Sequence, residues 1–316
     1  MTTTARTPDA SRQPTEPGTG ARTGPRWMPW APRLALIWAL TYGAVRVWFA
    51  IGHAPDWILP SDLLIPAWAS VAACLASAGL VLAVTRWPRS RALIVTTWAA
   101  AAGWVAVCAL ALLDLVGAAL PGLGLPFDLP ALLSRAGGLT GAALLAATAL
   151  ARRRQLDPTC LYCVGKRSTL PTAWATAGAW LAVAGCLGRL AAQAAVGFDV
   201  IPYDAGPSVL LFEGGFLLAG VALPLLLVYR LGRVFPRWML LLPGAALGAG
   251  ITAYFGVGLI QMITEALQGE RVFDGIDLPA AFFWVAVPCY LVWGLGLTTA
   301  TYGYYARTRK PCERCG

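Results

Sequence analysis

Two cysteine pairs with the spacing Cys-x-x-Cys are the residues of this 316-residue chain that are best suited to specific chemistry. Cys160 and Cys163 lie in a basic, polar segment near the middle of the sequence, and Cys312 and Cys315 lie in a similar segment at its C-terminal end. Two such pairs supply four thiolates, and four thiolates form a closed tetrahedral zinc site. The pattern therefore predicts a structural four-cysteine zinc site.

Two other interpretations of these cysteine pairs stay open. A Cys-x-x-Cys can also cycle between dithiol and disulfide, but each pair here follows the end of a predicted helix, where the helix dipole disfavours a thiolate. The third interpretation is that the pairs are surface cysteines without a role. The remaining four cysteines lie within apolar segments and are predicted to serve packing; they are Cys74, Cys108, Cys186 and Cys289.

Polar and charged residues inside apolar segments form the second group of candidates. Such residues are costly in a bilayer and mark functional sites by default. The predicted ligand-binding cluster consists of Arg46, Asp114, Arg189, Glu213, Gln261 and Glu265. All of them fall in the outer half of their segments, which predicts one outward-facing polar cavity. The alternative is structural pairing of Arg46 with Asp114 and of Arg189 with Glu213, in which the charges satisfy one another and bind nothing.

The segments that must position these residues are membrane spans. Hydrophobic residues make up 58% of the chain and charged residues 12%, whereas soluble proteins carry about 25% charged residues. A bilayer crossing needs about 20 apolar residues and has to be helical, because lipid offers no partner to unpaired backbone groups. Eight spans are predicted, at about 33–53, 63–85, 92–120, 131–151, 172–197, 207–229, 238–267 and 279–305.

The basic residues predict the orientation of these spans. Most of the 24 Lys and Arg residues fall in the N-terminal segment and in every second connection, while the alternate connections hold only Arg135 and Arg271 and are acidic, with Asp62 and Asp128 among them. By the positive-inside rule, both termini and both cysteine pairs face the cytoplasm. Short basic clusters between spans do not form a folded basic surface that could bind a nucleic-acid duplex, so nucleic acid is excluded as a partner.

An internal duplication is the predicted domain organisation. Arg46 has a counterpart in Arg189, and Cys160 in Cys312, and the offset between corresponding positions rises smoothly along the chain. Residues 1–30 are a polar, disordered tail, 31–168 form a first four-helix repeat and 169–316 form a second. Repeats with an even number of spans share one orientation, as in parallel transporter repeats.

These observations predict an all-α integral membrane protein with eight transmembrane helices, resembling a bacterial inner-membrane protein from a high-GC genome. The leading functional hypothesis is binding or transport of a small or lipid-like ligand through the outer cavity. One alternative is an integral membrane enzyme acting on a lipid or isoprenoid, with Asp114 or Glu213 as general acid. The other is a signalling or scaffold protein whose cysteine pairs dock a cytosolic protein partner. His53 is the only histidine, which excludes a bis-histidine haem site within one chain.

Overall fold

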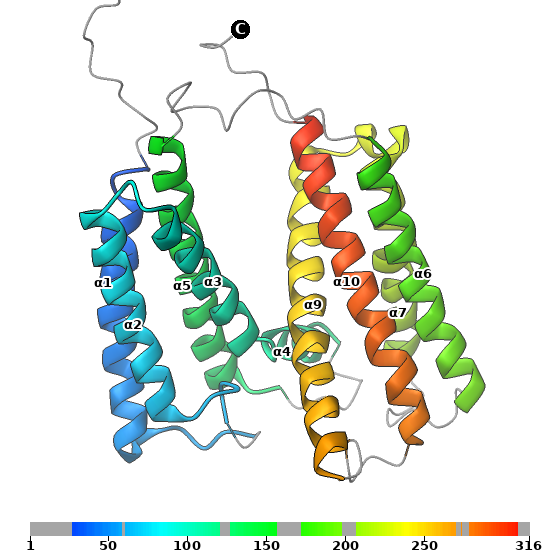
Figure 1. The fold of residues 1–316 in the computed structure, drawn as a ribbon. Coiled ribbons are helices and arrows are strands. Elements are labelled where there is room, and N and C mark those ends of the chain that lie inside the picture. Colours follow the sequence, from blue (N-terminus) through cyan, green and yellow to red (C-terminus); the bar gives the residue numbers. More distant parts are fainter. Residues whose placement is uncertain are drawn as a thin grey trace, which may run out of the picture.

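The computed structural model describes residues 27–58, 61–120, 127–156, 172–197, 207–269, 273 and 278–308, all helical or connecting segments. The helices form two bundles that stand side by side with their long axes nearly parallel (Figure 1). The cysteine pairs Cys160/Cys163 and Cys312/Cys315 lie outside the described residues.

The first bundle is built from the N-terminal half of the chain. It comprises α1 (Ala31–Trp48) with a π-helical turn η1 (Phe49–His53), α2 (Ala67–Arg86), α3 (Arg91–Val107), α4 (Ala111–Ala119) and α5 (Leu129–Leu156). Helix α1 packs against α2 and α5, and α3 packs against α2 and α5. The bundle therefore closes on itself in chain order.

The second bundle repeats this packing order with less regular helices. It comprises α6 (Thr172–Val196), α7 (Pro207–Leu217), a π-helical turn η3 (Leu218–Ala222), α8 (Leu223–Val228), a 3₁₀ turn η4 (Arg230–Val234), α9 (Arg237–Gln268) and α10 (Ala280–Thr308). Helix α10 packs against α6 and α9, and α8 packs against α6 and α9. The first helix, α6, thus contacts α8 and the last helix, α10, just as α1 contacts α2 and the last helix, α5, in the first bundle.

The prediction of a helical protein with many membrane spans is confirmed. Within the described residues, seven helices are long and apolar enough to cross a membrane, and α3 with α4 forms an eighth candidate that is bent by 46°. Large apolar side chains such as Trp68, Leu75 and Leu82 are exposed along α2. Helices that are apolar on their outer as well as their inner faces belong in lipid. The duplication and the orientation stay predictions.

The ends of the helices follow local sequence signals. Ser90 caps α3, since its hydroxyl accepts a hydrogen bond from the Leu93 amide at 3.4 Å, as expected of an N-cap serine. Helix α9 ends at Gly269, which has a φ of 75°, a left-handed conformation that glycine adopts without strain.

Small residues allow a close helix contact in the second bundle, between α6 and α10. A methyl group added at Gly296 would lie 2.5 Å from the Ala182 amide nitrogen and 2.6 Å from the Gly178 carbonyl oxygen. These neighbours are backbone atoms, so neither side can yield without a shift of a whole helix. Such contacts are typical of membrane helix interfaces.

The two bundles touch where α3 and α4 meet α9. Leu112 of α4 packs against the hydrophobic cluster of the second bundle. The C-terminal ends of α1 and α6 and the N-terminal ends of α5 and α10 all lie at one end of the molecule (Figure 1), which we call the Arg46 end. The C-terminal ends of α5 and α10, which lead into the cysteine segments, lie at the opposite end.

Candidate functional site

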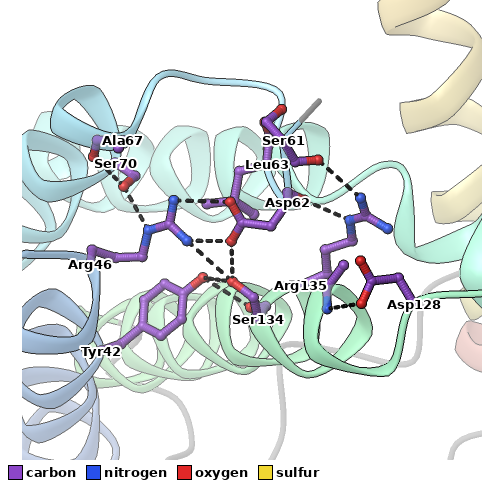
Figure 2. Close-up of polar contacts among 11 residues, drawn as sticks. Tyr42, Arg46, Ser61, Asp62, Leu63, Ala67, Ser70, Asp128, Ser134 and Arg135 are labelled. Atoms are coloured by element: carbon purple, nitrogen blue, oxygen red, sulfur yellow. Dashed lines mark hydrogen bonds and ion pairs between the residues drawn. The ribbon is translucent and has the colours of Figure 1, made fainter. Parts of the chain in front are cut away.

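Arg46 is the centre of a buried hydrogen-bond network in the first bundle. Its Nε donates to Ser70 Oγ at 2.7 Å, and its Nη2 donates to Asp62 Oδ1 at 3.3 Å. Its Nη1 donates to Asp62 Oδ2 and to Ser134 Oγ at 3.2 Å. The Ser134 hydroxyl also donates to Asp62, and Tyr42 donates to the Ser134 carbonyl. Every guanidinium nitrogen of Arg46 thus has a protein partner (Figure 2).

Arg135 forms a second buried ion pair beside the first. Its Nη1 donates to Asp114, and its Nε donates to the backbone carbonyl of Asp62 at 2.6 Å. The Nη2 group donates to the Ser61 carbonyl at 3.4 Å. Arg135 therefore connects α4 and α5 to the 61–65 segment, and Figure 2 shows the two arginines on either side of Asp62.

The connection between α1 and α2 is folded against the bundle to supply these partners. The Ser61 hydroxyl donates to the Leu63 carbonyl at 2.6 Å, which closes a tight turn, and the Leu64 amide donates to the Val107 carbonyl. Leu63 is buried in the first hydrophobic cluster. Asp128 accepts from the Ile58 amide at 3.0 Å and from the Ala131 amide at the start of α5. Asp62 and Leu63 are thus part of the core, while Ser61 and Leu64 stay exposed.

The network of the first bundle balances its own charge. Two arginines face two aspartates, and the side chains of both pairs are almost fully buried. Removing one partner from such a pair leaves an uncompensated charge and costs about 3–5 kcal/mol. Asp114 is 1% exposed, so a substrate does not reach it as a general acid without rearrangement. The first bundle has the character of a structural clamp.

Arg189 of α6 is a buried arginine of the second bundle, and its surroundings differ from those of Arg46. Its Nη1 donates to both oxygens of Glu213 on α7, at 3.1 and 3.2 Å. The guanidinium lies over the Phe216 ring, 4.7 Å from its centroid, and 5.8 Å from the centroid of Tyr290. A side-chain hydrogen bond also links Arg189 and Tyr290. Arg189 is thus held by one carboxylate, two aromatic faces and the Tyr290 side chain.

Two buried N–H groups beside Phe216 lack a hydrogen-bond partner within the described chain, namely Arg189 Nε and Trp293 Nε1. Arg189 is 7% exposed and Trp293 is 1% exposed. The buried tryptophans of the first bundle are satisfied by contrast, because Trp38 donates to the Gly137 carbonyl and Trp104 to Ser77 Oγ. Unpartnered buried polar groups are rare in proteins. The Nε groups of Arg152, Arg154 and Arg237 also lack a partner within the described chain, but these arginines lie near helix ends, whereas Arg189 and Trp293 lie within the spans.

The helices around Arg189 are also irregular. The π-helical turn η3 begins two residues after Phe216, and Pro288 interrupts the hydrogen bonds of α10 just before Tyr290. Gly220 of η3 lies against Cys186 and Trp293, since an added methyl group would meet both. Single π-helical turns often occur at functional sites.

The structure separates the six residues of the predicted cluster into three groups. Arg46 and Asp114 lie in the first bundle, Arg189 and Glu213 pair in the second, and Gln261 donates to Glu265 on the exposed surface of α9 at 2.7 Å. Glu265 also accepts from the Phe273 amide. The pairing of Arg189 with Glu213 is confirmed. The predicted pairing of Arg46 with Asp114 is wrong, because Arg46 pairs with Asp62 and Asp114 pairs with Arg135.

Sequence reasoning missed Asp62, Ser70, Ser134 and Arg135. Arg135 was assigned to an outer connection but lies within α5 and is fully buried. Its signal was available, since Arg135 falls inside the predicted span 131–151, where a charged residue needs a partner. No sequence signal showed that the 61–65 segment folds inward.

The metal prediction falls outside the described residues. The four cysteines of the described helices are free thiols, and within the described chain no three His, Cys, Asp or Glu side chains are placed to hold a metal ion. Comparisons with protein families, with curated proteins and with solved structures found no match.

Proposed function

We propose that the second bundle of this membrane protein binds a small or lipid-like ligand at Arg189 and that the first bundle is its rigid support. One observation carries the proposal. The buried Nε group of Arg189 has no hydrogen-bond partner within the described chain, whereas all the guanidinium nitrogens of Arg46 have one.

The energetics favour a ligand over a purely structural role. A buried donor without an acceptor costs about 1–3 kcal/mol, and a charged group in a membrane span adds to that cost. The Glu213 side chain is 24% exposed, so the pair is accessible from the bundle surface. An arginine that served only as a structural clamp would be expected to resemble Arg46, with a hydrogen-bond acceptor for each of its guanidinium nitrogens.

The test compares compounds that co-purify with the full chain in a neutral detergent. Mass spectrometry of wild type and Arg189→Gln is expected to show at least one small molecule or lipid that falls about tenfold or more in the variant, because a hydrogen bond to a charged group is worth about 1.5–3 kcal/mol. Arg89→Gln, which changes an exposed arginine, is the control. Identical profiles for all three folded proteins would contradict the proposal.

We also propose the parallel duplication, with both termini and both cysteine pairs in the cytoplasm. The shared packing order of the two bundles supports the duplication. The orientation is supported by basic residues opposite the Arg46 end, namely Arg86, Arg152 and Arg307 near the C-terminal ends of α2, α5 and α10 and Arg89 in the connection between α2 and α3. Labelling of Cys160 with an impermeant maleimide in intact and in lysed cells tests the orientation, and labelling of intact cells would contradict it.

The four-cysteine zinc site is a separate proposal. It is supported by the spacing of Cys160, Cys163, Cys312 and Cys315 and by α5 and α10, whose C-terminal ends lie at the same end of the molecule (Figure 1). Elemental analysis of purified wild type is expected to give one zinc per chain, and Cys160→Ser/Cys312→Ser is expected to give none. Metal-free wild type from a chelator-free preparation would remove the site.

A further inference from the structure

We infer that the ligand of the second bundle carries an anionic oxygen group, a carboxylate or a phosphate, which replaces the Glu213 carboxylate on Arg189. This inference rests on the proposed function and names the chemical class of its ligand. Three observations support it: the unpartnered groups at the site are hydrogen-bond donors, Glu213 contacts only one nitrogen of Arg189, and the side chains around Arg189 are aromatic and apolar.

The two unpartnered groups are both donors. Arginine Nε and tryptophan Nε1 carry a hydrogen and have no lone pair to accept with. They flank one ring, since the Arg189 guanidinium carbon lies 4.7 Å from the Phe216 centroid and the Trp293 ring centroid lies 4.5 Å from it. Glu213 and Tyr290 hydrogen-bond to Arg189, but these two N–H groups still lack an acceptor. A ligand that offers several oxygens supplies it, whereas an ammonium group or a metal cation does not.

Glu213 occupies Arg189 incompletely. Both carboxylate oxygens share the single nitrogen Nη1, whereas the strongest arginine–carboxylate pairs use two nitrogens and two oxygens in parallel. In the first bundle Asp62 does accept from both Nη1 and Nη2 of Arg46. The Glu213 side chain is also more exposed than its partner, at 24% against 8%. An incoming anion can therefore displace it and reach Nε as well.

The surroundings suit an anion that is attached to an apolar body. Phe216 and Tyr290 present aromatic faces to the guanidinium, and Phe255 stacks on Tyr290 at 3.8 Å. Leu217 and Leu218, next to Phe216 on the chain, are exposed on the lipid-facing side. A lipid headgroup and a free anion both carry the required oxygens, and the experiment has to separate these two sources.

The experiment measures dissociation constants for the full chain in dodecyl maltoside, a neutral detergent without a phosphate group. Dodecyl phosphate is the lipid-like probe, inorganic phosphate is the free anion, and dodecyltrimethylammonium is the cationic probe of equal tail length. Wild type is expected to bind dodecyl phosphate and not the cationic probe. Arg189→Gln is expected to weaken binding about tenfold or more, because it removes hydrogen bonds from a charged donor. Trp293→Phe keeps the ring and is expected to weaken binding several-fold.

Glu213→Gln is the decisive variant. If the ligand displaces Glu213, the substitution removes the competing charge and strengthens binding of dodecyl phosphate, by about tenfold, whereas it weakens binding if Glu213 holds Arg189 in position for the ligand. Asp56→Asn removes an exposed carboxylate elsewhere and is expected to change nothing. Unchanged or weaker binding by Glu213→Gln overturns the inference, as does preference for the cationic probe. Competition by inorganic phosphate supports it with a free anion as the source, and its absence supports it with a lipid as the source.

The two proposals fail in different ways. An Arg189-dependent co-purifying compound that is neutral or cationic keeps the proposed function and overturns the anion. Co-purification profiles that do not depend on Arg189, together with no binding of either phosphate probe, overturn both. Trp293 gives an independent readout, since its indole N–H resonance, assigned through Trp293→Phe, is expected to shift on addition of dodecyl phosphate. A resonance that stays in place while the probe binds would remove Trp293 from the site.

Discussion

Replacing Arg46 with methionine is expected to destabilise the protein by about 3–5 kcal/mol, because it leaves Asp62 buried without a cation. Methionine fills much of the volume of the arginine side chain, so the lost charge rather than a cavity dominates the effect. Ser70 and Ser134 lose their charged donor at the same time. The 61–65 segment loses one of its anchors, while Arg135 and the Leu64 amide still hold it.

Thermal unfolding in detergent, followed by circular dichroism, checks this result. Arg89→Gln is the control at an exposed arginine and is expected to melt with wild type. The paired variant Arg46→Met/Asp62→Leu is expected to recover most of the stability, because apolar residues often replace a buried ion pair at little net cost. A single variant as stable as wild type would show that Asp62 is not held in the buried position described.

Replacing Gly296 with valine is expected to be the second large perturbation, and it acts through packing. The new side chain would collide with the backbone of Ala182 and Gly178, and helix α6 would have to move away from α10. Overpacking of a tight core costs about 1–3 kcal/mol and sometimes more. The loss of stability is expected to lie near the upper end of this range, since no flexible side chain lies between the two helices at this point.

Gly258→Val is the matched control for this prediction. Gly258 lies in α9, and an added methyl group would meet nothing within 4 Å. The control protein is expected to retain its melting temperature, while Gly296→Val melts lower. Equal melting temperatures would mean that α6 and α10 are not packed through this glycine.

The membrane spans could be predicted from sequence because the requirement for a long apolar helix acts on each segment by itself. The ends of α2 at Ala67 and Arg86 differ little from the predicted span 63–85. The bend between α3 and α4 could not be predicted from sequence; it lies close to Leu112, which packs against the hydrophobic cluster of the second bundle. A contact between segments far apart in the chain leaves no pattern in the local sequence.

The candidate site was predictable only in part, for a related reason. Arg189 and Glu213 were identified as candidates because a charge within a span needs a partner. Asp62 looked like an ordinary acidic residue of a connection, and its burial depends on Arg46 and Arg135 approaching it from two different helices. The separation of Glu265 from Arg189 depends on which face α9 turns toward α10, and several faces of that helix are equally apolar.

The inward-folded 61–65 segment also affects how this end of the protein can be handled. A connection between two spans would normally be chosen for an epitope tag or a protease site, because exposed loops tolerate insertion. Here Asp62 and Leu63 are buried and the backbone carbonyls of Ser61 and Asp62 accept from Arg135. An inserted peptide would separate the two arginines. The exposed residues around Asp56 are the place in the same connection for a reporter.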